Sequence, residues 1–175
     1  MVRTRVGYTG GRHPNPSYHD LGDHTEALQV DFDPEQITYE ALMECFWEGR
    51  DHDRRAFSVQ YRSAVWFADE AQEASARERA ARIGTRVTTA IEPLGTFTLA
   101  EGYHQKYRLR REPKLVEELV ARYGSDEAMV ASTAAARING YLGSYASDRE
   151  VQALLPLLEL SEASAQRLLA RLHRS

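Results

Sequence analysis

The hydrophobic pattern of this chain changes along its length, and that change restricts the fold more than any other feature. Up to about residue 107, segments that alternate as strands do are separated by segments with helical spacing. Beyond residue 125 only helical spacing recurs. Strands mixed with helices and then followed by helices alone predict an α+β fold, a two-layer sandwich with a helical C-terminal extension. We expect one domain over residues 1–124 and the extension over residues 125–175.

The individual segments are predicted from alternation, helical spacing and capping residues. Strands are expected over residues 3–8, 25–33, 59–67 and 86–92, and helices over residues 39–48, 70–83, 102–111 and 113–123, with Thr38 and Asp69 as N-caps. In the extension, helices are expected from Ser125 to Arg137 and after Asp148 and Ser161, with residues 139–145 as a turn. Residues 10–22 are rich in turn formers, which predicts an irregular loop of the kind that often carries function.

The composition excludes several classes of protein. The chain has 175 residues, of which 42% are hydrophobic and 27% charged, as in globular domains and unlike disordered or fibrous chains. A formal net charge of -4 argues against a general binder of nucleic acid. No apolar run has the length of a signal-peptide core or of a transmembrane helix. The expected location is therefore the cytoplasm, with no membrane association.

A series of motifs in one order resembles a single enzyme family. The motifs are GYTGG at residues 7–11, NPSY at 15–18, GDHTEALQVDFDP at 22–34, ITYEALMECFW at 37–47, QYRSAVWF at 60–67, IEPLG at 91–95 and AEGYHQKY at 100–107, while STAAARINGYLG at 132–143 resembles one branch of the family. Together they resemble the peptide-methionine (S)-S-oxide reductases, also called methionine sulfoxide reductase A. The resemblance implies a ferredoxin-like mixed sheet with helices, reduction of methionine-(S)-sulfoxide in proteins and as the free amino acid, and repair of oxidative damage.

The chemistry of this family requires four kinds of group. A thiolate attacks the sulfoxide sulfur and the oxygen is protonated as it leaves, so the site needs a nucleophile, a proton donor, hydrogen-bond donors to the oxygen and an apolar slot for the methyl group. The resemblance implies that Glu26 is the general acid and that Tyr18 and Tyr61 hydrogen-bond the sulfoxide oxygen. A phenol keeps its proton at neutral pH, so each tyrosine can donate.

The residues themselves leave a structural alternative open for each of these three positions. In the alternation of its strand, Glu26 falls on the side of Leu28 and Val30, the expected inward side, where an apolar environment would suit a general acid. The pattern alone favours a surface residue at the edge of a strand, and only the resemblance favours the general acid. Tyr18 could be a packed loop residue and Tyr61 a core-strand aromatic.

The nucleophile of the family lies in a GCFWG motif upstream of the GYTGG segment, and the 175 residues contain no such motif. The first strand and helix of the family core are missing with it, so the chain alone is expected to be inactive. Met1 stands where the family has a valine, so we expect the motif to be encoded in frame upstream. The alternative is a non-catalytic sulfoxide-binding remnant. Ala56 replaces the aspartate that the family commonly carries five residues before Tyr61, which indicates a branch with a trimmed loop.

Cys45 is the only cysteine, and ECFW at residues 44–47 imitates part of the missing motif. It lies inside a predicted helix, on the side of Leu42 and Phe46 and next to Glu44. A reactive thiolate is favoured by a helix N-terminus or a nearby cation, and by partial exposure. We therefore predict that Cys45 is buried and inert, and that the family's nucleophile is absent from these residues.

The remaining polar clusters suggest a different chemistry only weakly. HDLGDH at residues 19–24 and DHD at 51–53 match no ordered spacing of three or four zinc ligands, so no metal site is predicted, and a metal-dependent hydrolase is an alternative function. His104 is expected to be structural, and Arg167, Arg171 and Arg174 to form a solvated helix face. No dissociable cofactor is implied. The resemblance implies oxidised proteins or methionine sulfoxide as substrate, and thioredoxin or another thiol reductant as electron donor.

Overall fold

The computed structural model describes residues 2–48, 56–84 and 86–172. By its contacts the chain divides into two compact units, the first formed by Val6–Glu101 and the second by Val2–Arg5 together with the chain from Gly102 onward. The sequence-based division after residue 124 concerns the extent of the family domain and stays a prediction. Within the described residues, no helix combines the length and the apolar character needed to cross a bilayer.

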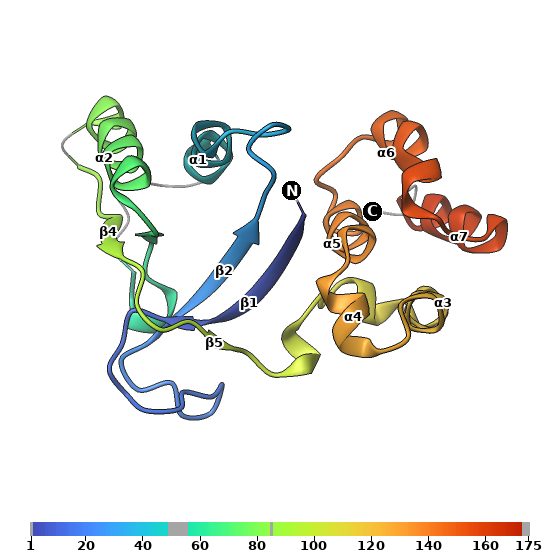
Figure 1. Cartoon of the computed structure of the whole chain (residues 1–175), viewed down its shortest axis with the longest axis horizontal. Coiled ribbons are helices and arrows are strands. Elements are labelled where there is room, and N and C mark those ends of the chain that lie inside the picture. Colours follow the sequence, from blue (N-terminus) through green and yellow to red (C-terminus); the bar gives the residue numbers. More distant parts are fainter. Residues whose placement is uncertain (1, 49–55, 85, 173–175) are drawn as a thin grey trace. The chain divides into compact units, whose positions relative to one another are not determined.

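One sheet has three strands, with β1 at its centre (Figure 1). β1 (Arg3–Thr9) lies between β2 (Thr25–Asp31) and β5 (Thr98–Leu99). The β1–β5 pair is antiparallel, with Gly7 opposite Leu99. β2 is therefore an edge strand of this sheet in the described part of the chain, which leaves one of its sides without a strand neighbour.

A second sheet holds two parallel strands, β3 (Ala64–Phe67) and β4 (Ala90–Pro93), with Val65 opposite Ile91. Parallel neighbours need a crossover connection, and here it contains a helix. Antiparallel and parallel pairs combined with helices confirm the predicted α+β class. The antiparallel pair and the parallel pair thus lie in two separate sheets and not in one mixed sheet.

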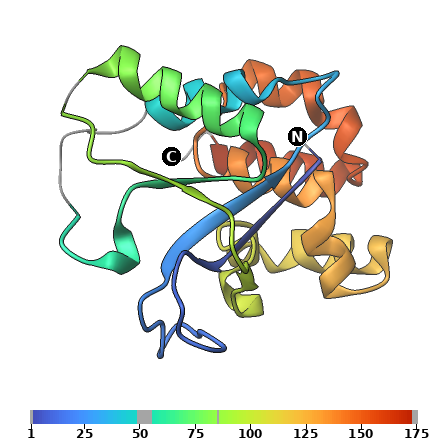
Figure 2. The same cartoon turned by 60° about the vertical axis from the view of Figure 1, so that its left-hand side comes forward.

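Among the described residues of the first unit there are two helices, and both begin at the residues that the sequence predicts. α1 (Tyr39–Glu48) starts after Thr38, whose hydroxyl accepts a bond from the backbone N–H of Ala41. α2 (Glu70–Ile83) starts after Asp69, whose carboxylate accepts from the N–H of Gln72. α2 contacts α1 and both strands of the β3–β4 sheet (Figure 2). It therefore forms the crossover layer over that sheet.

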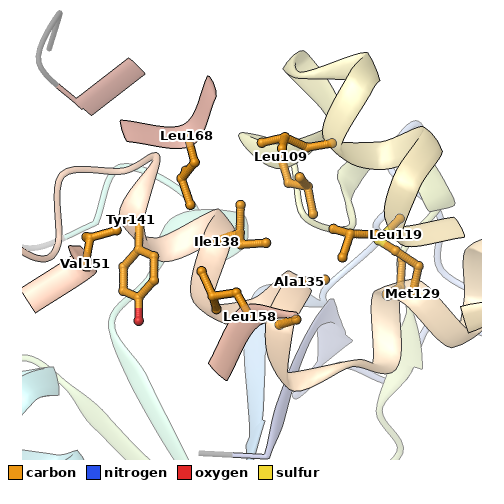
Figure 3. Packing of buried hydrophobic residues seen from close by; sticks show 12 residues of the cluster. Leu109, Leu119, Met129, Ala135, Ile138, Tyr141, Val151, Leu158 and Leu168 are labelled. Atoms are coloured by element: carbon orange, nitrogen blue, oxygen red, sulfur yellow. The ribbon is translucent and has the colours of Figure 1, made fainter. Parts of the chain in front are cut away.

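The second unit is helical and has its own core. Its helices are α3 (Pro113–Tyr123), α4 (Asp126–Ala131), α5 (Thr133–Tyr141), α6 (Asp148–Leu154) and α7 (Glu162–Leu172), with 3-10 turns at Gly102–His104, Leu109–Arg111 and Leu155–Leu158. Leu109, Leu119 and Ile138 are fully buried members of its core cluster (Figure 3). The predicted helical character of this region is confirmed, since apolar side chains from separate short helices combine into one core.

Four predicted elements differ from the observed ones. The helix predicted over residues 102–111 is wrong, because this segment forms two separate 3-10 turns, Gly102–His104 and Leu109–Arg111. Val59–Tyr61 forms a 3-10 turn, so the strand predicted over residues 59–67 covers only its last four residues as β3. The strand predicted over residues 86–92 is reduced to β4. The single helix predicted from Ser125 to Arg137 is two helices, because Ser132 has an extended backbone and its side chain caps α5.

Two further boundaries in the second unit are shifted. Ser147, not Asp148, caps α6, and it forms a reciprocal capping box with Glu150. The turn predicted at residues 139–145 begins late, because residues up to Tyr141 continue α5. The predicted cap at Ser161 is confirmed by a hydrogen bond of 3.3 Å from the N–H of Ser164 to its hydroxyl.

Candidate active site

Glu26 lies at the second position of β2, and its side chain is exposed. The sequence-based prediction that Glu26 faces an apolar interior is therefore wrong. The side of β2 that carries Glu26 also carries Leu28, which is 61% exposed, so this is the open side of the strand in the described residues. Alternation correctly places Glu26 and Leu28 on the same face of β2, but it does not determine which face of the sheet is covered.

Gln60 brings Glu26 and Tyr61 into one hydrogen-bonded group. Its Nε2 atom donates to Oε1 of Glu26 at 2.8 Å and to the hydroxyl oxygen of Tyr61 at 3.0 Å. Tyr61 is the last residue of the 3-10 turn and not a core-strand aromatic, and it is 50% exposed. The carboxyl group and the phenol therefore lie beside each other at the surface of the first unit.

The pKa of Tyr61 is affected by Tyr18 as well as by Glu26. Desolvation raises the pKa of Tyr61 above its usual value, and electrostatic interaction first with Glu26 and then with Tyr18 raises it further. The hydrogen bond from Gln60 acts in the opposite direction and lowers that pKa. The structure thus joins Glu26 and Tyr61 through Gln60, and it places Tyr18 within electrostatic range of Tyr61.

Tyr18 lies at the tip of a tight turn within the irregular loop. Ser17 and Asp20 close this turn with two backbone hydrogen bonds of 3.1 Å. The N–H of Tyr18 donates to Oε1 of Glu101 at 2.9 Å, and the other carboxylate oxygen of Glu101 accepts from the hydroxyl of Tyr8 at 2.6 Å. Because Tyr8 is buried in β1, Glu101 anchors an otherwise exposed turn to the sheet.

Arg62 joins the two chain segments that carry Glu26 and Tyr61. Its Nε donates to the hydroxyl of Thr25 at 3.0 Å, and its two terminal nitrogens donate to the carboxylate of Glu92, each at 2.7 Å. The hydroxyl of Thr25 in turn donates to the carbonyl of Val59 at 2.9 Å. These hydrogen bonds therefore hold β2, the 3-10 turn and β4 together next to Glu26 and Tyr61.

Gly10 fits against this arginine because it has no side chain. A Cβ atom at this position would lie 2.8 Å from Nη2 of Arg62 and 3.0 Å from the indole nitrogen of Trp66. Its φ of 80° is also in the region that favours glycine. Gly10 is thus favoured both by its backbone conformation and by its close packing on Arg62. The guanidinium of Arg62 lies over the Trp66 ring.

Cys45 is exposed, so the prediction that it is buried is wrong. Trp47 is the buried aromatic residue of α1. Helical spacing instead predicted burial of the side that carries Leu42, Cys45 and Phe46. A large indole removes more apolar area from water than a thiol does, so its burial decides how the short helix is turned. Cys45 lies in the last turn of α1 and not at a helix N-terminus, where reactive cysteines commonly occur.

The histidine and aspartate residues of the loop have structural partners. One carboxylate oxygen of Asp23 accepts from the N–H groups of Arg12 and His13, and these bonds lower the pKa of Asp23. The ring of His24 hydrogen-bonds the carbonyl of His13 at 2.9 Å. No cluster of three potential metal ligands occurs in the part of the chain that the structure describes. The DHD segment at residues 51–53 lies outside the described residues.

The family is decided by comparison with known proteins. The model of the family described as "Peptide methionine sulfoxide reductase" matches residues 1–136. The chain belongs to this family. A solved structure titled methionine sulfoxide reductase A of Corynebacterium diphtheriae is similar with a TM-score of 0.53 and 35% identity over 63% of each chain. Reduced Mxr1 from Saccharomyces cerevisiae is similar with a TM-score of 0.55 and 28% identity, over 63% of this chain and 71% of the other.

Curated relatives extend the comparison over most of the chain. Peptide methionine sulfoxide reductase A5 from Arabidopsis thaliana is 39% identical over 152 residues, which is 81% of this chain and 59% of the relative. A peptide methionine sulfoxide reductase from Drosophila melanogaster is 33% identical over 172 residues, 95% of this chain and 69% of the relative. The matched chain thus spans less than two thirds of the length of the Arabidopsis relative.

Three residues of the site were missed by sequence reasoning. Gln60 and Arg62 flank Tyr61 in the QYRS segment, and Glu101 lies in the AEGYHQKY segment. Each was part of a motif that carried the resemblance, but none was assigned a task. The available signal was the position of polar residues next to the proposed tyrosine, and only the folded chain identifies their partners.

Proposed function

We propose that this chain provides the sulfoxide-recognition part of a peptide-methionine (S)-S-oxide reductase. The substrate is a methionine-(S)-sulfoxide side chain in an oxidised protein, or the free sulfoxide. Glu26 acts as the general acid, and Tyr18 and Tyr61 donate hydrogen bonds to the sulfoxide oxygen. The observation that carries the proposal is the single hydrogen-bonded group of Glu26, Gln60 and Tyr61, with Tyr18 close enough to affect the pKa of Tyr61.

The chemistry divides between this group and a cysteine. A thiolate attacks the sulfoxide sulfur, the S–O bond breaks, and the oxygen leaves as water after it accepts two protons. Glu26 supplies one proton where the negative charge develops, the solvent supplies the second, and the phenols stabilise that charge before the transfer. No GCFWG motif occurs among the 175 residues, and Cys45 lies in the last turn of α1. These residues alone are therefore proposed to bind sulfoxide without turning it over.

The electrons come from a thiol donor. Water then adds to the sulfur of the nucleophile as its bond to the substrate sulfur breaks, which releases methionine and leaves a sulfenic acid on the cysteine. A second thiol attacks this sulfenic acid, releases water and forms a disulfide, which the thiol donor reduces. Thioredoxin or another small thiol reductant is the proposed donor. The proposal places this reaction in the cytoplasm, since thiol reductants are kept reduced there.

The test is binding of N-acetyl-methionine-(S)-sulfoxide to the 175-residue chain by titration calorimetry. Y61F and Y18F should each weaken binding by about tenfold, because each removes one hydrogen bond to the oxygen. Y145F is the matched control, since Tyr145 is 84% exposed and lies in the second unit. Absence of measurable binding, or equal binding by Y61F, Y18F and Y145F, would contradict the proposal.

A second measurement locates the nucleophile. With dithiothreitol as reductant, the 175-residue chain and its C45S variant should both show no turnover above background. Robust turnover that C45S abolishes would make Cys45 the nucleophile and overturn this assignment. A chain extended at its N-terminus by a family segment carrying GCFWG should reduce the (S) epimer, and E26Q should then lower kcat by about a hundredfold or more.

The alternative function is a non-catalytic sulfoxide-binding remnant. It predicts the same binding by the 175 residues. It differs in the extended chain, because a site that has lost its catalytic alignment would bind sulfoxide and still show no turnover. Restored turnover in the extended chain therefore favours the reductase, and binding without restored turnover favours the remnant.

A further inference from the structure

We propose that Gln60 is a positioning residue, which holds the Glu26 carboxyl group and the Tyr61 hydroxyl group in one orientation so that the phenolic proton is turned toward the substrate oxygen. This inference rests on the proposed function and extends it to a residue with no assigned task. The observation behind it is that one amide nitrogen contacts both groups, at 2.8 Å and 3.0 Å.

The orientation of the Gln60 amide follows from the chemistry of its partners. Oε1 of Glu26 accepts a hydrogen bond both when the group is ionised and when it carries its proton on Oε2, so the amide NH2 group, and not its oxygen, faces Oε1. The NH2 group has two protons, which suffices for one bond to Glu26 and one to Tyr61. Both protons of the amide are then used within the site.

The consequence for Tyr61 is directional. An amide NH2 group cannot accept a hydrogen bond, so the bond between Gln60 and Tyr61 occupies a lone pair of the phenolic oxygen and leaves the phenolic proton to be donated elsewhere. The ring of Tyr61 is half-exposed, so a ligand can reach its hydroxyl. Gln60 thus makes Tyr61 a donor toward an incoming sulfoxide oxygen, the role that recognition requires.

The backbone that carries Gln60 is fixed on both sides. The carbonyl of Val59 accepts from the hydroxyl of Thr25 at 2.9 Å, and the same carbonyl accepts from the N–H of Arg62 at 3.3 Å. Thr25 is buried and is the neighbour of Glu26 in β2. Gln60 therefore connects two groups whose own segments are already joined, so its short side chain spans the gap with little loss of freedom.

The first experiment measures Tyr61 directly and needs no substrate. Ring-labelled tyrosine is titrated by NMR in the wild-type chain and in Q60M, with the Tyr61 signal assigned from Y61F. Methionine keeps the length of the side chain but cannot donate, so the pKa of Tyr61 should rise in Q60M. The control is Q36M, which removes a bond of the same kind, from Gln36 to Asp33 at 2.9 Å, and should leave the Tyr61 titration unchanged.

The second experiment measures recognition of N-acetyl-methionine-(S)-sulfoxide. Q60M should bind it about tenfold more weakly than the wild type, while Q36M binds it equally well. Equal urea midpoints for Q60M and Q36M would show that loss of folding is not the cause. An unchanged Tyr61 titration in Q60M, or sulfoxide binding equal to wild type, overturns the role of Gln60.

The two ideas fail in different ways. If the wild-type chain binds no sulfoxide, the proposed function fails, and a Tyr61 titration that Q60M leaves unchanged then also removes Gln60 as a positioning residue. If the wild-type chain binds sulfoxide and Q60M binds it equally, the proposed function stands and the inference about Gln60 fails.

Discussion

At the scale of single residues, the site depends on polar side chains that contact the proposed catalytic groups and not the substrate. Gln60 contacts Glu26 and Tyr61, and Glu101 contacts the backbone of Tyr18. These contacts orient the exposed Glu26 carboxyl group and the Tyr61 phenol, and they fix the backbone that carries Tyr18. Without such partners, each side chain would sample several rotamers, and ordering them would cost binding free energy.

The role of Glu101 can be tested by removing its carboxylate. E101A should destabilise the chain by about 1–2 kcal/mol, because the buried Tyr8 hydroxyl loses an acceptor, and should speed hydrogen exchange at the Tyr18 amide. E101Q keeps one acceptor oxygen and should lie between wild type and E101A in both measurements. Unchanged exchange at Tyr18 in E101A would show that the turn is held by other contacts.

At the scale of elements, short segments are held together by polar bridges because none of them is long enough to be stable alone. β3 and β4 have four residues each, and the 3-10 turn has three. Arg62 connects this turn to β2 and to β4. Lys106 makes a comparable connection in the second unit, where its ammonium group donates to the carbonyl and hydroxyl of Thr4.

The Arg62 bridge predicts a change in acid stability. Hydrogen bonding by Arg62 lowers the pKa of Glu92, so this pair stabilises the fold above the usual glutamate pKa of 4.5, and the stabilisation is lost as pH falls through the lowered value. R62M should cost about 1–2 kcal/mol at pH 7, measured by urea unfolding, and the difference from wild type should shrink toward pH 3. R77M is the control, since the Arg77–Glu73 pair on α2 is exposed and should contribute less than about 0.5 kcal/mol.

Lys106 predicts a change in the alkaline range. Burial, assisted by the charge of Arg5, lowers the pKa of Lys106 from 10.5 to about 8. Between these values the unfolded chain binds a proton that the folded chain does not, so stability rises with pH from about 8 to 10.5, by at most about 3 kcal/mol. K106M lacks this group. The free energy of unfolding of the wild type, measured with urea, should therefore rise relative to that of K106M across this pH range. Parallel curves for the two proteins would contradict the shift.

At the scale of the whole molecule, the two compact units differ in how they are stabilised. The second unit has a large apolar cluster built from five helices and their connecting turns. The buried cluster of the first unit that contains Tyr8, Leu21 and Ala100 is small, and polar bridges surround the proposed site. Functional geometry is thus carried by hydrogen bonds in one unit, whereas the other follows the ordinary rules of helix packing.

A core substitution in the second unit tests that description. L119A should lower the free energy of unfolding by about 2–5 kcal/mol, because Leu119 is fully buried and its truncation leaves a cavity among packed helices. L157A changes a leucine that is 59% exposed and should alter stability by less than about 0.5 kcal/mol. Hydrogen exchange of the α3 and α5 amides measures both effects, and equal protection in the two variants would argue against the core in Figure 3.

The sequence by itself determined the elements whose signals are local. Thr38 and Asp69 cap their helices because capping needs only a side-chain oxygen and the next N–H groups. The α+β class and the family followed from periodicity and motif order. Tyr18, Glu26 and Tyr61 were also singled out from the sequence, although their roles stay a proposal.

Only the tertiary structure decided which sides of these elements are covered and which polar groups meet. The open side of β2 exposes Glu26, and the burial of Trp47 turns Cys45 outward, against both predictions from spacing. Gln60 and Arg62 have partners more than 25 residues away in the chain. Burial and pairing at such separations depend on competition among all segments for the same space and the same donors, which a local pattern does not contain.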